Sequence, residues 1–406
     1  MTKLIDGGVC APLGFSANGV LAGIKPGRTK NDLALIYSEK PCSVGAVFTS
    51  NLVKAEPVKL SREHVKTGRA QAVIANSGNA NACTGAKGAE NALRMARAAA
   101  NALSVAETDV IVCSTGVIGQ QINIDVIEKA LPKLKEGLSR SGNVAAREAI
   151  MTTDTVYKEV AVETTIGGKT VRIGTMAKGS GMIHINMGTM LGFITTDCAI
   201  SSEMLQAALS ESIKGTYNCV SVDGDTSTND TLSILANGMA GNAEIKAKGA
   251  DYDAFLAALN EVNTMMARKI AADGEGAERL IECTVQGASS VEVARKLAKS
   301  VISSSLVKAA FFGADANWGR ILCAMGYSGE FFDQTKTSVS FTNSKGTIDV
   351  CKDGADLPFD EDKAKIVLGE KEVKILITLK DGNASGTAWG CDLTYEYVKI
   401  NGDYRT

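Results

Sequence analysis

Closely spaced cysteines and histidines, which build metal centres and disulfide frameworks, are missing from this sequence. Its 406 residues include ten cysteines and two histidines. The histidines, His64 and His184, lie far apart, and no two cysteines form a C-x-x-C pair. Zinc sites and disulfide frameworks need closer spacing, so we expect neither. The cysteines should be reduced and mostly buried, as small hydrophobic groups.

An excess of charge and long apolar runs are also missing. The formal net charge is -2, and no run of Lys or Arg suggests a basic tail. Nucleic acid is therefore an unfavourable partner. No segment reaches the roughly 18 apolar residues of a membrane helix, and the N-terminal residues lack the apolar run of a signal peptide. We expect a cytoplasmic protein that acts on small molecules, without a membrane partner.

Signatures of nucleotide and calcium binding are absent as well. The sequence has no P-loop and no strand-linked G-x-G-x-x-G, and the short Gly179-Ser180-Gly181 does not replace them. The polar loop at 223–230 contains alternating acids but lacks the spacing of a twelve-residue calcium loop. We expect neither a bound cofactor nor a metal.

The pattern of apolar residues indicates an α/β protein of the α+β type. Turn residues separate short β-like runs near both ends of the chain, which is typical of antiparallel sheets. Helical periodicity predicts helices at 88–103, 125–138, 144–151, 201–213, 251–272 and 290–303. Strands are predicted at 170–177, 190–195, 231–236, 280–285, 339–341, 373–377 and 393–398, among others. Their order does not indicate a doubly wound sheet.

The stretch KGSGMIHINMGTMLGFITTD, at 178–197, lies near the midpoint of the chain and contains Gly188-Thr189. A threonine hydroxyl needs a base beside it to become a good nucleophile, and cleavage before Thr189 would supply the residue's own amine. That amine, with an ordinary pKa of about 7.7 to 8.0, is a suitable base near neutrality. Taken alone, Gly188-Thr189 fits an ordinary turn into a strand better, so the surrounding motifs decide.

Those motifs run through nearly the whole chain. They are KGSGMI at 178–183, NMGTML at 186–191 and TTD at 195–197, with further matches at 76–85, 113–119, 151–155, 221–231, 273–277, 313–320 and 401–406. On these motifs the sequence resembles the glutamate N-acetyltransferase/ornithine acetyltransferase family of arginine biosynthesis. Two positions depart from the commonest pattern: His184-Ile185 replaces Ala-Pro or His-Pro, and Gly188 replaces a frequent alanine. Without that proline, processing could be slower or altered.

The resemblance implies self-cleavage at Gly188-Thr189 into an α chain, 1–188, and a β chain, 189–406, intertwined as one catalytic unit and assembled as an α2β2 heterotetramer. It also implies an αββα-like sandwich of mainly antiparallel sheets flanked by helices, related to self-processing aminopeptidases of the DmpA type. The implied reaction is a ping-pong transfer of acetyl from N2-acetyl-L-ornithine to L-glutamate through acetyl-Thr189. Acetyl-CoA is a possible second donor.

Several site residues carry over from the resemblance by position. Thr115 and Gly116 match the oxyanion hole, where a hydroxyl and a backbone N–H stabilise the developing negative charge. Glu275 matches an active-site position that serves the substrate amino group or proton transfer. The substrate-binding positions are Thr152, Lys178, Thr189, Glu275, Asn401 and Thr406, and a lysine suits the carboxylates of ornithine and glutamate. His184 is interpreted as a loop histidine rather than a catalytic base.

Two other functions remain open on the sequence. The same N-terminal threonine could serve an amidohydrolase or aminopeptidase that transfers its acyl group to water. Release of acetate or amino acids without glutamate would indicate that activity. A non-enzymatic small-molecule binder would instead remain one uncut chain without an acetyl-enzyme.

Overall fold

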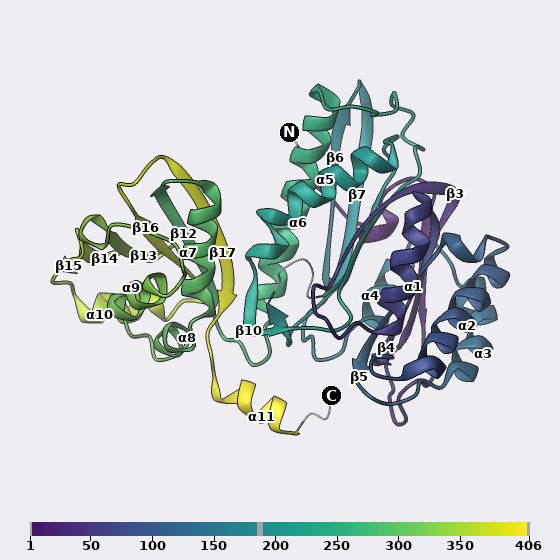
Figure 1. Cartoon of the computed structure of the whole chain (residues 1–406), viewed down its shortest axis with the longest axis horizontal. Helices are drawn as coiled ribbons and strands as arrows, with labels where there is room; N and C mark the ends of the chain where they lie inside the picture. The colour runs from purple at the N-terminus through teal and green to yellow at the C-terminus, as the bar shows by residue number, and fades with distance from the viewer. Residues whose placement is uncertain (1, 185–189, 404–406) are drawn as a thin grey trace.

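The computed structural model describes residues 2–184 and 190–403. Within them, the larger of two main sheets has nine strands (Figure 1). Along this sheet the strands are β1 (Lys3–Ile5), β6 (Lys158–Ile166), β7 (Lys169–Lys178), β9 (Leu191–Thr196), β11 (Thr231–Ala236), β3 (Leu33–Phe48), β4 (Arg69–Asn79) and β5 (Val110–Val117), with β2 (Phe15–Val20) also paired to β3. The pairs β9–β11 and β4–β5 are parallel and the others antiparallel.

Strand β3 shows why helices cover both faces of this sheet. Successive side chains of a strand point to opposite faces, and both sets are apolar here. Leu33 and Leu35 belong to the core cluster formed with α2 (Gly85–Leu103) and α3 (Ile124–Glu136). Ala34 and Ile36 belong to the cluster formed with α4 (Asn143–Ala149).

The second sheet has six strands and lies at the other side of the molecule in Figure 1. Its order is β15 (Ala355–Asp356), β14 (Gly346–Lys352), β13 (Ser338–Asn343), β16 (Glu372–Thr378), β12 (Leu280–Ala288) and β17 (Ala384–Cys391). Helix α6 (Ala250–Ala272) lies between the two sheets in Figure 1 and contacts strands of both. One core cluster therefore joins α6 to the interiors of both sheets.

The remaining elements cover the sheets or close the molecule. Strands β8 (Ile183–His184) and β10 (Ser221–Thr226) form a small separate pair. The other helices are α1 (Glu56–His64), α5 (Ser202–Lys214), α7 (Val291–Ser303), α8 (Ser305–Phe312), α9 (Trp318–Gly326), α10 (Glu361–Leu368) and α11 (Tyr395–Asp403). Helix α7 packs on β12 and β17 through an apolar face that includes the fully buried Leu297 and Val301.

The predicted fold class, an α/β protein of mainly antiparallel sheets with flanking helices, is confirmed. The six predicted helices are present, with ends shifted by three residues or fewer. The strand predicted at 393–398 is wrong, because α11 occupies this region. Its alternating pattern does not reflect a half-buried sheet face, since Tyr395 is 82% exposed and Val398 is 67% exposed. The predicted polar loop after residue 220 is also partly strand β10.

The midpoint stretch leads into the centre of the larger sheet. Strand β7 precedes the stretch, and β9, which follows it, pairs antiparallel with β7 and parallel with β11. Gly188 and Thr189 lie outside the described residues, so the predicted division into 1–188 and 189–406 stays a prediction. What the structure shows is that segments on both sides of this division share one continuous sheet.

Candidate active site

Six of the predicted site residues line one small pocket of about 90 Å³. They come from segments that are far apart in the sequence, and strand ends and loops bring them together. The lining residues are Ala80, Thr115, Gly116, Ile118, Thr152, Thr153, Lys178, Gly181, Met182, Ser227, Thr228, Asn229, Glu275 and Asn401. Thr189 and Thr406, the other two predicted substrate contacts, lie outside the described residues.

The predicted oxyanion pair stands at the end of β5. There Gly116 pairs with Gly78 of the neighbouring parallel strand β4. A Cβ atom on Gly116 would lie 2.4 Å from the carbonyl carbon of Gly78, and its φ of +133° is a conformation that other residues rarely adopt. Only glycine fits here, and Thr115 is presented beside it at the pocket wall.

Lys178, the last residue of β7, points toward Thr115. Its Nζ lies 3.4 Å from Thr115 Oγ1, and the residue is 9% exposed. Burial lowers the pKa of Lys178 below the usual lysine value, an effect that the carboxylates of Asp154, Asp230 and Glu275 oppose. A negatively charged ligand group would help to keep this ammonium protonated.

Glu275 follows α6 between two glycines and reaches the same pocket. Its backbone N–H donates to the carbonyl of Ser180 at 3.0 Å, and Asn401 Nδ2 donates to its Oε2 at 2.8 Å. A Cβ atom on Gly181 would lie 2.3 Å from this carboxyl group. The absence of a side chain at Gly181 therefore allows Glu275 to lie against the backbone of the midpoint stretch.

A smaller adjoining cavity of about 20 Å³ connects this site to the residue after the predicted nucleophile. Met190 lines it together with Thr115, Lys178 and Asp230. Asp230 precedes β11 and is 2% exposed. The sequence did not single it out for catalysis, because the loop at 221–230 contains several acids and hydroxyls of similar appearance.

His184 lies in the short strand β8, so its interpretation as a loop residue is wrong. Its Nδ1 lies 3.0 Å from Ser221 Oγ. His184 is part of a strand because β8 pairs antiparallel with β10. Burial, helped by the charge of Lys299, lowers the pKa of His184 to about 4. Above that pH the ring is neutral.

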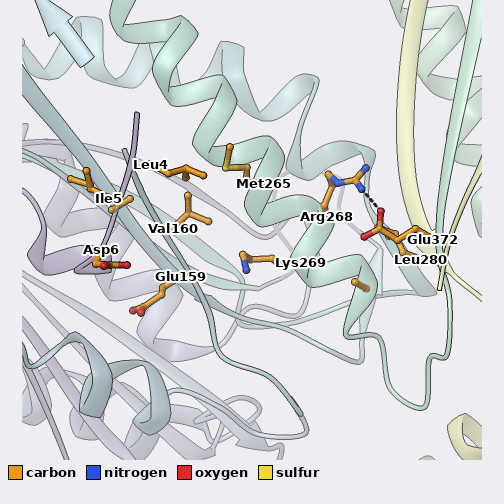
Figure 2. A pocket seen from close by; sticks show the side chains of 12 residues that line it. Leu4, Ile5, Asp6, Glu159, Val160, Met265, Arg268, Lys269, Leu280 and Glu372 are labelled. Atoms are coloured by element: carbon orange, nitrogen blue, oxygen red, sulfur yellow. Dashed lines mark hydrogen bonds and ion pairs between the residues drawn. The ribbon is translucent and has the colours of Figure 1, made fainter. Parts of the chain in front are cut away.

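A wider cavity of about 560 Å³ lies elsewhere, between the β1 edge and α6 (Figure 2). Figure 2 shows Arg268 paired with Glu372 at one side of the labelled residues, and their Nη2–Oε2 distance is 2.9 Å. Its lining contains no serine, threonine or cysteine and none of the predicted site residues. An acyl group could therefore not be held there by a hydroxyl or thiol nucleophile.

Two features are absent from the described part of the chain. Across residues 2–184 and 190–403, no group of three or more His, Cys, Asp or Glu side chains could hold a metal ion. No helix in the same part of the chain is long and apolar enough to cross a membrane. All ten cysteines are free thiols; eight are buried, with Cys83 and Cys323 exposed, which agrees with the prediction that most are buried.

Comparisons with known proteins agree with the motifs. The model of the ArgJ family matches residues 16–406. The arginine biosynthesis bifunctional protein ArgJ of Caldanaerobacter subterraneus subsp. tengcongensis is 50% identical over 404 residues, covering 100% of both chains. The protein of the same name from Symbiobacterium thermophilum is 52% identical over 403 residues, covering 99% of both.

A solved structure extends this likeness to the fold. The crystal structure of arginine biosynthesis bifunctional protein argJ from Bacillus halodurans is 44% identical in sequence, with a TM-score of 0.50. It covers 53% of this chain and 100% of that chain. Together with the pocket, these relatives define the class of the protein as an acyltransferase enzyme. The chain belongs to the ArgJ family, as the motifs predicted.

Proposed function

We propose that this protein transfers the acetyl group of N2-acetyl-L-ornithine to L-glutamate, giving L-ornithine and N-acetyl-L-glutamate. The observation that carries the proposal is the single pocket lined by Thr115, Gly116, Lys178 and Glu275. Met190, the residue that follows the predicted nucleophile in the sequence, lines the adjoining cavity, which supports the proposal. Membership of a family whose relatives are called arginine biosynthesis bifunctional proteins supports the choice of substrates.

The chemistry begins with self-cleavage. Thr189 Oγ attacks the Gly188 carbonyl carbon. An ester forms as the peptide C–N bond breaks, and water then hydrolyses that ester. The freed amine of Thr189 can then remove the proton of its own Oγ. Ester formation thus frees the amine that serves as catalytic base, and hydrolysis of the ester then releases the hydroxyl nucleophile.

Acetyl transfer then takes two steps. Thr189 Oγ attacks the acetyl carbonyl carbon of acetylornithine, and Thr115 and Gly116 donate hydrogen bonds to the oxyanion. The amide C–N bond breaks, and the α-amine of ornithine leaves with the proton taken from Oγ. In the second step the glutamate amine attacks the acetyl ester, and its proton returns to Oγ. Free Thr189 is restored.

Substrate recognition follows from the two charged side chains. The α-carboxylate shared by both substrates suits the Lys178 ammonium, because a bound anion offsets the cost of burying that charge. Glu275, oriented by Asn401, is placed to accept a hydrogen bond from a substrate amino group or to carry its proton. Thr152 lines the pocket nearby.

We also propose two features of the whole enzyme. The α chain, 1–188, and the β chain, 189–406, assemble as an α2β2 heterotetramer in the cytoplasm. Acetyl-CoA serves as a second acetyl donor, which would fit the word "bifunctional" in the names of the relatives. The transfer itself needs no bound cofactor, since all the groups invoked above belong to the chain.

The direct test combines mass and activity. Wild-type protein should give two fragments under denaturing conditions, divided at Gly188/Thr189, and should acetylate glutamate from acetylornithine. Thr189→Ala should remain one inactive chain. Acetyl transfer by Thr189→Ala would contradict the mechanism, and release of acetate without any need for glutamate would favour a hydrolase instead.

A further inference from the structure

Beside the active-site pocket, three buried charged side chains form a cluster that the proposed reaction does not use. They are Asp154, after α4; Lys158, at the start of β6; and Asp273, after α6. The side chains of Asp154 and Lys158 are fully buried, and that of Asp273 is 5% exposed. Burying three charges costs free energy unless they are paired, so their arrangement needs a reason.

Lys158 pairs with both carboxylates. Its Nζ lies 2.7 Å from Asp154 Oδ1 and also donates to Asp273 Oδ2. One ammonium thus joins the loop that carries Thr152 to the loop that carries Glu275. The two carboxylates are 119 positions apart in the chain and lie on opposite sides of the predicted cut.

Asp154 and Asp273 also contact the pocket segments, Asp154 through its carboxylate and Asp273 through its own backbone carbonyl. Asp154 accepts hydrogen bonds from the backbone N–H groups of Thr152, at 3.1 Å, and Gly179, at 2.8 Å. Ser180 Oγ donates to the backbone carbonyl of Asp273 at 2.6 Å. Gly179 directly follows Lys178, and Asp273 lies two residues before Glu275. The cluster therefore contacts the segments that carry three predicted substrate-binding residues.

Two members of the cluster, Lys158 and Asp154, also act on the charge of the Lys178 ammonium. Burial lowers the pKa of Lys178 most strongly; Lys158 lowers it further, whereas Asp154, Asp230 and Glu275 raise it. Lys158 belongs to β6, and Asp154 lies in the loop before it. Asp230 precedes β11, and Glu275 follows α6.

We propose that Lys158 is a positioning residue that joins the Thr152, Lys178 and Glu275 segments into one pocket and holds Asp154 against the backbone that follows Lys178. This rests on the proposed function only for the substrate that Lys178 binds. The arrangement of charges itself is independent of that substrate.

Three substitutions separate this role from simple support of the fold. Lys158→Met removes a positive charge facing Lys178 and releases Asp154, so Lys178 should stay protonated to higher pH. Asp154→Asn removes a negative charge, so Lys178 should lose its proton at lower pH. Lys158→Arg, which keeps the charge, is the matched control and should leave the Lys178 titration near that of the wild type.

The titration can be read without any activity. Protein with isotope-labelled lysine side chains is titrated by NMR, and the Lys178 signal is assigned by its loss in Lys178→Met. Shifts of opposite sign in Lys158→Met and Asp154→Asn, with none in Lys158→Arg, are expected. Equal titrations in all variants, or shifts of the same sign, would overturn the proposal. If Lys158→Met does not fold, Asp154→Asn against Lys158→Arg still decides the question.

Acetyl transfer provides the second measurement. KM for acetylornithine should increase with pH as Lys178 loses its proton, at a lower pH in Asp154→Asn than in wild type. Lys158→Met should also lose about 10- to 100-fold in kcat/KM because the pocket segments are displaced, and Lys158→Arg should recover much of it. If the wild type transferred no acetyl group, the proposed function would fail, whereas the NMR titration would still test the cluster.

Discussion

At the scale of single residues, Thr115 and Gly116 have the most specific proposed role. Gly116 is held against Gly78 with no room for a side chain, and Thr115 stands next to it with its hydroxyl near Lys178. We expect Thr115→Ala to lower kcat about 100- to 1,000-fold with little change in KM, because an oxyanion donor acts mainly on the transition state. Steady-state kinetics with acetylornithine and glutamate measure this. A mainly raised KM would instead place Thr115 in substrate binding.

Asp230 gives a prediction about stability. Its Oδ2 has no hydrogen-bond partner among the described residues, and burial raises the pKa of this carboxyl well above its ordinary value. A carboxyl whose pKa is raised on folding contributes its stability at low pH and loses it as the pH increases from the unfolded pKa toward the folded one. Asp230→Asn should therefore be more stable than wild type at neutral pH, with the gain disappearing in acid. Thermal unfolding from pH 4 to pH 8 measures it.

The matched variant for that experiment is Asp197→Asn. Asp197 is also fully buried with a raised pKa, but it accepts hydrogen bonds from the backbone N–H groups of Leu13 and Arg172. Losing these bonds should destabilise the protein. An Asp230→Asn variant that is as unstable as Asp197→Asn at neutral pH would show that the Asp230 carboxyl is satisfied in the folded protein.

A site residue can be predicted from the sequence only where the motif around it is distinctive. Thr115, Gly116, Lys178 and Glu275 lie in small-residue or glycine-flanked motifs, and the structure brings all four to one pocket. Lys158 is different, because it begins an ordinary strand and its sequence neighbours carry no signal of burial. Its role depends on Asp273, which reaches it only through the path of α6. Such long-range pairing of charges cannot be predicted from local pattern.

At the scale of elements, α11 contacts the pocket from the surface. None of its residues is buried, yet Asn401 reaches Glu275, and Thr394, just before the helix, donates to the carbonyl of Gly276 at 2.7 Å. A Cβ atom on Gly276 would lie 2.6 Å from the backbone nitrogen of Tyr397. The helix therefore docks closely on the Glu275 loop without contributing to the core.

Removal of the chain after residue 394 should separate function from stability. We expect kcat/KM to fall about tenfold or more because Glu275 loses its orienting partner, while the midpoint of urea unfolding changes little because no residue of α11 is buried in the core. Asn401→Ala tests the single contact and should show a smaller loss of activity. Normal activity of the truncated protein would contradict a role of α11 at the site.

The same helix shows where element prediction failed. The strands at 170–177 and 231–236 were predictable because they are buried apolar runs in the sheet. The run at 393–398 alternates between apolar and polar residues, as a half-buried strand does, but Tyr395 and Val398 are exposed and pack on no sheet. Period-two patterning identifies a strand only when burial causes it, and the sequence does not reveal that at a surface segment.

At the scale of the whole molecule, one sheet joins both sides of the predicted cut. Strand β9 lies between β7 and β11, and all three are fully or largely buried. We therefore expect the cut protein to keep the mass of the intact assembly in native size measurements and to separate only in denaturant. Dissociation of the two fragments in native buffer would contradict this shared core.

The most direct measurement is the site of acetylation in the enzyme itself. Purified protein is incubated with acetylornithine alone, denatured in acid and analysed by mass spectrometry of its fragments. One acetyl group should be found on Thr189 at the start of the second fragment, and it should disappear when glutamate is added before denaturation. No acetyl group on Thr189, or an acetyl group there that glutamate does not remove, would contradict transfer through this residue.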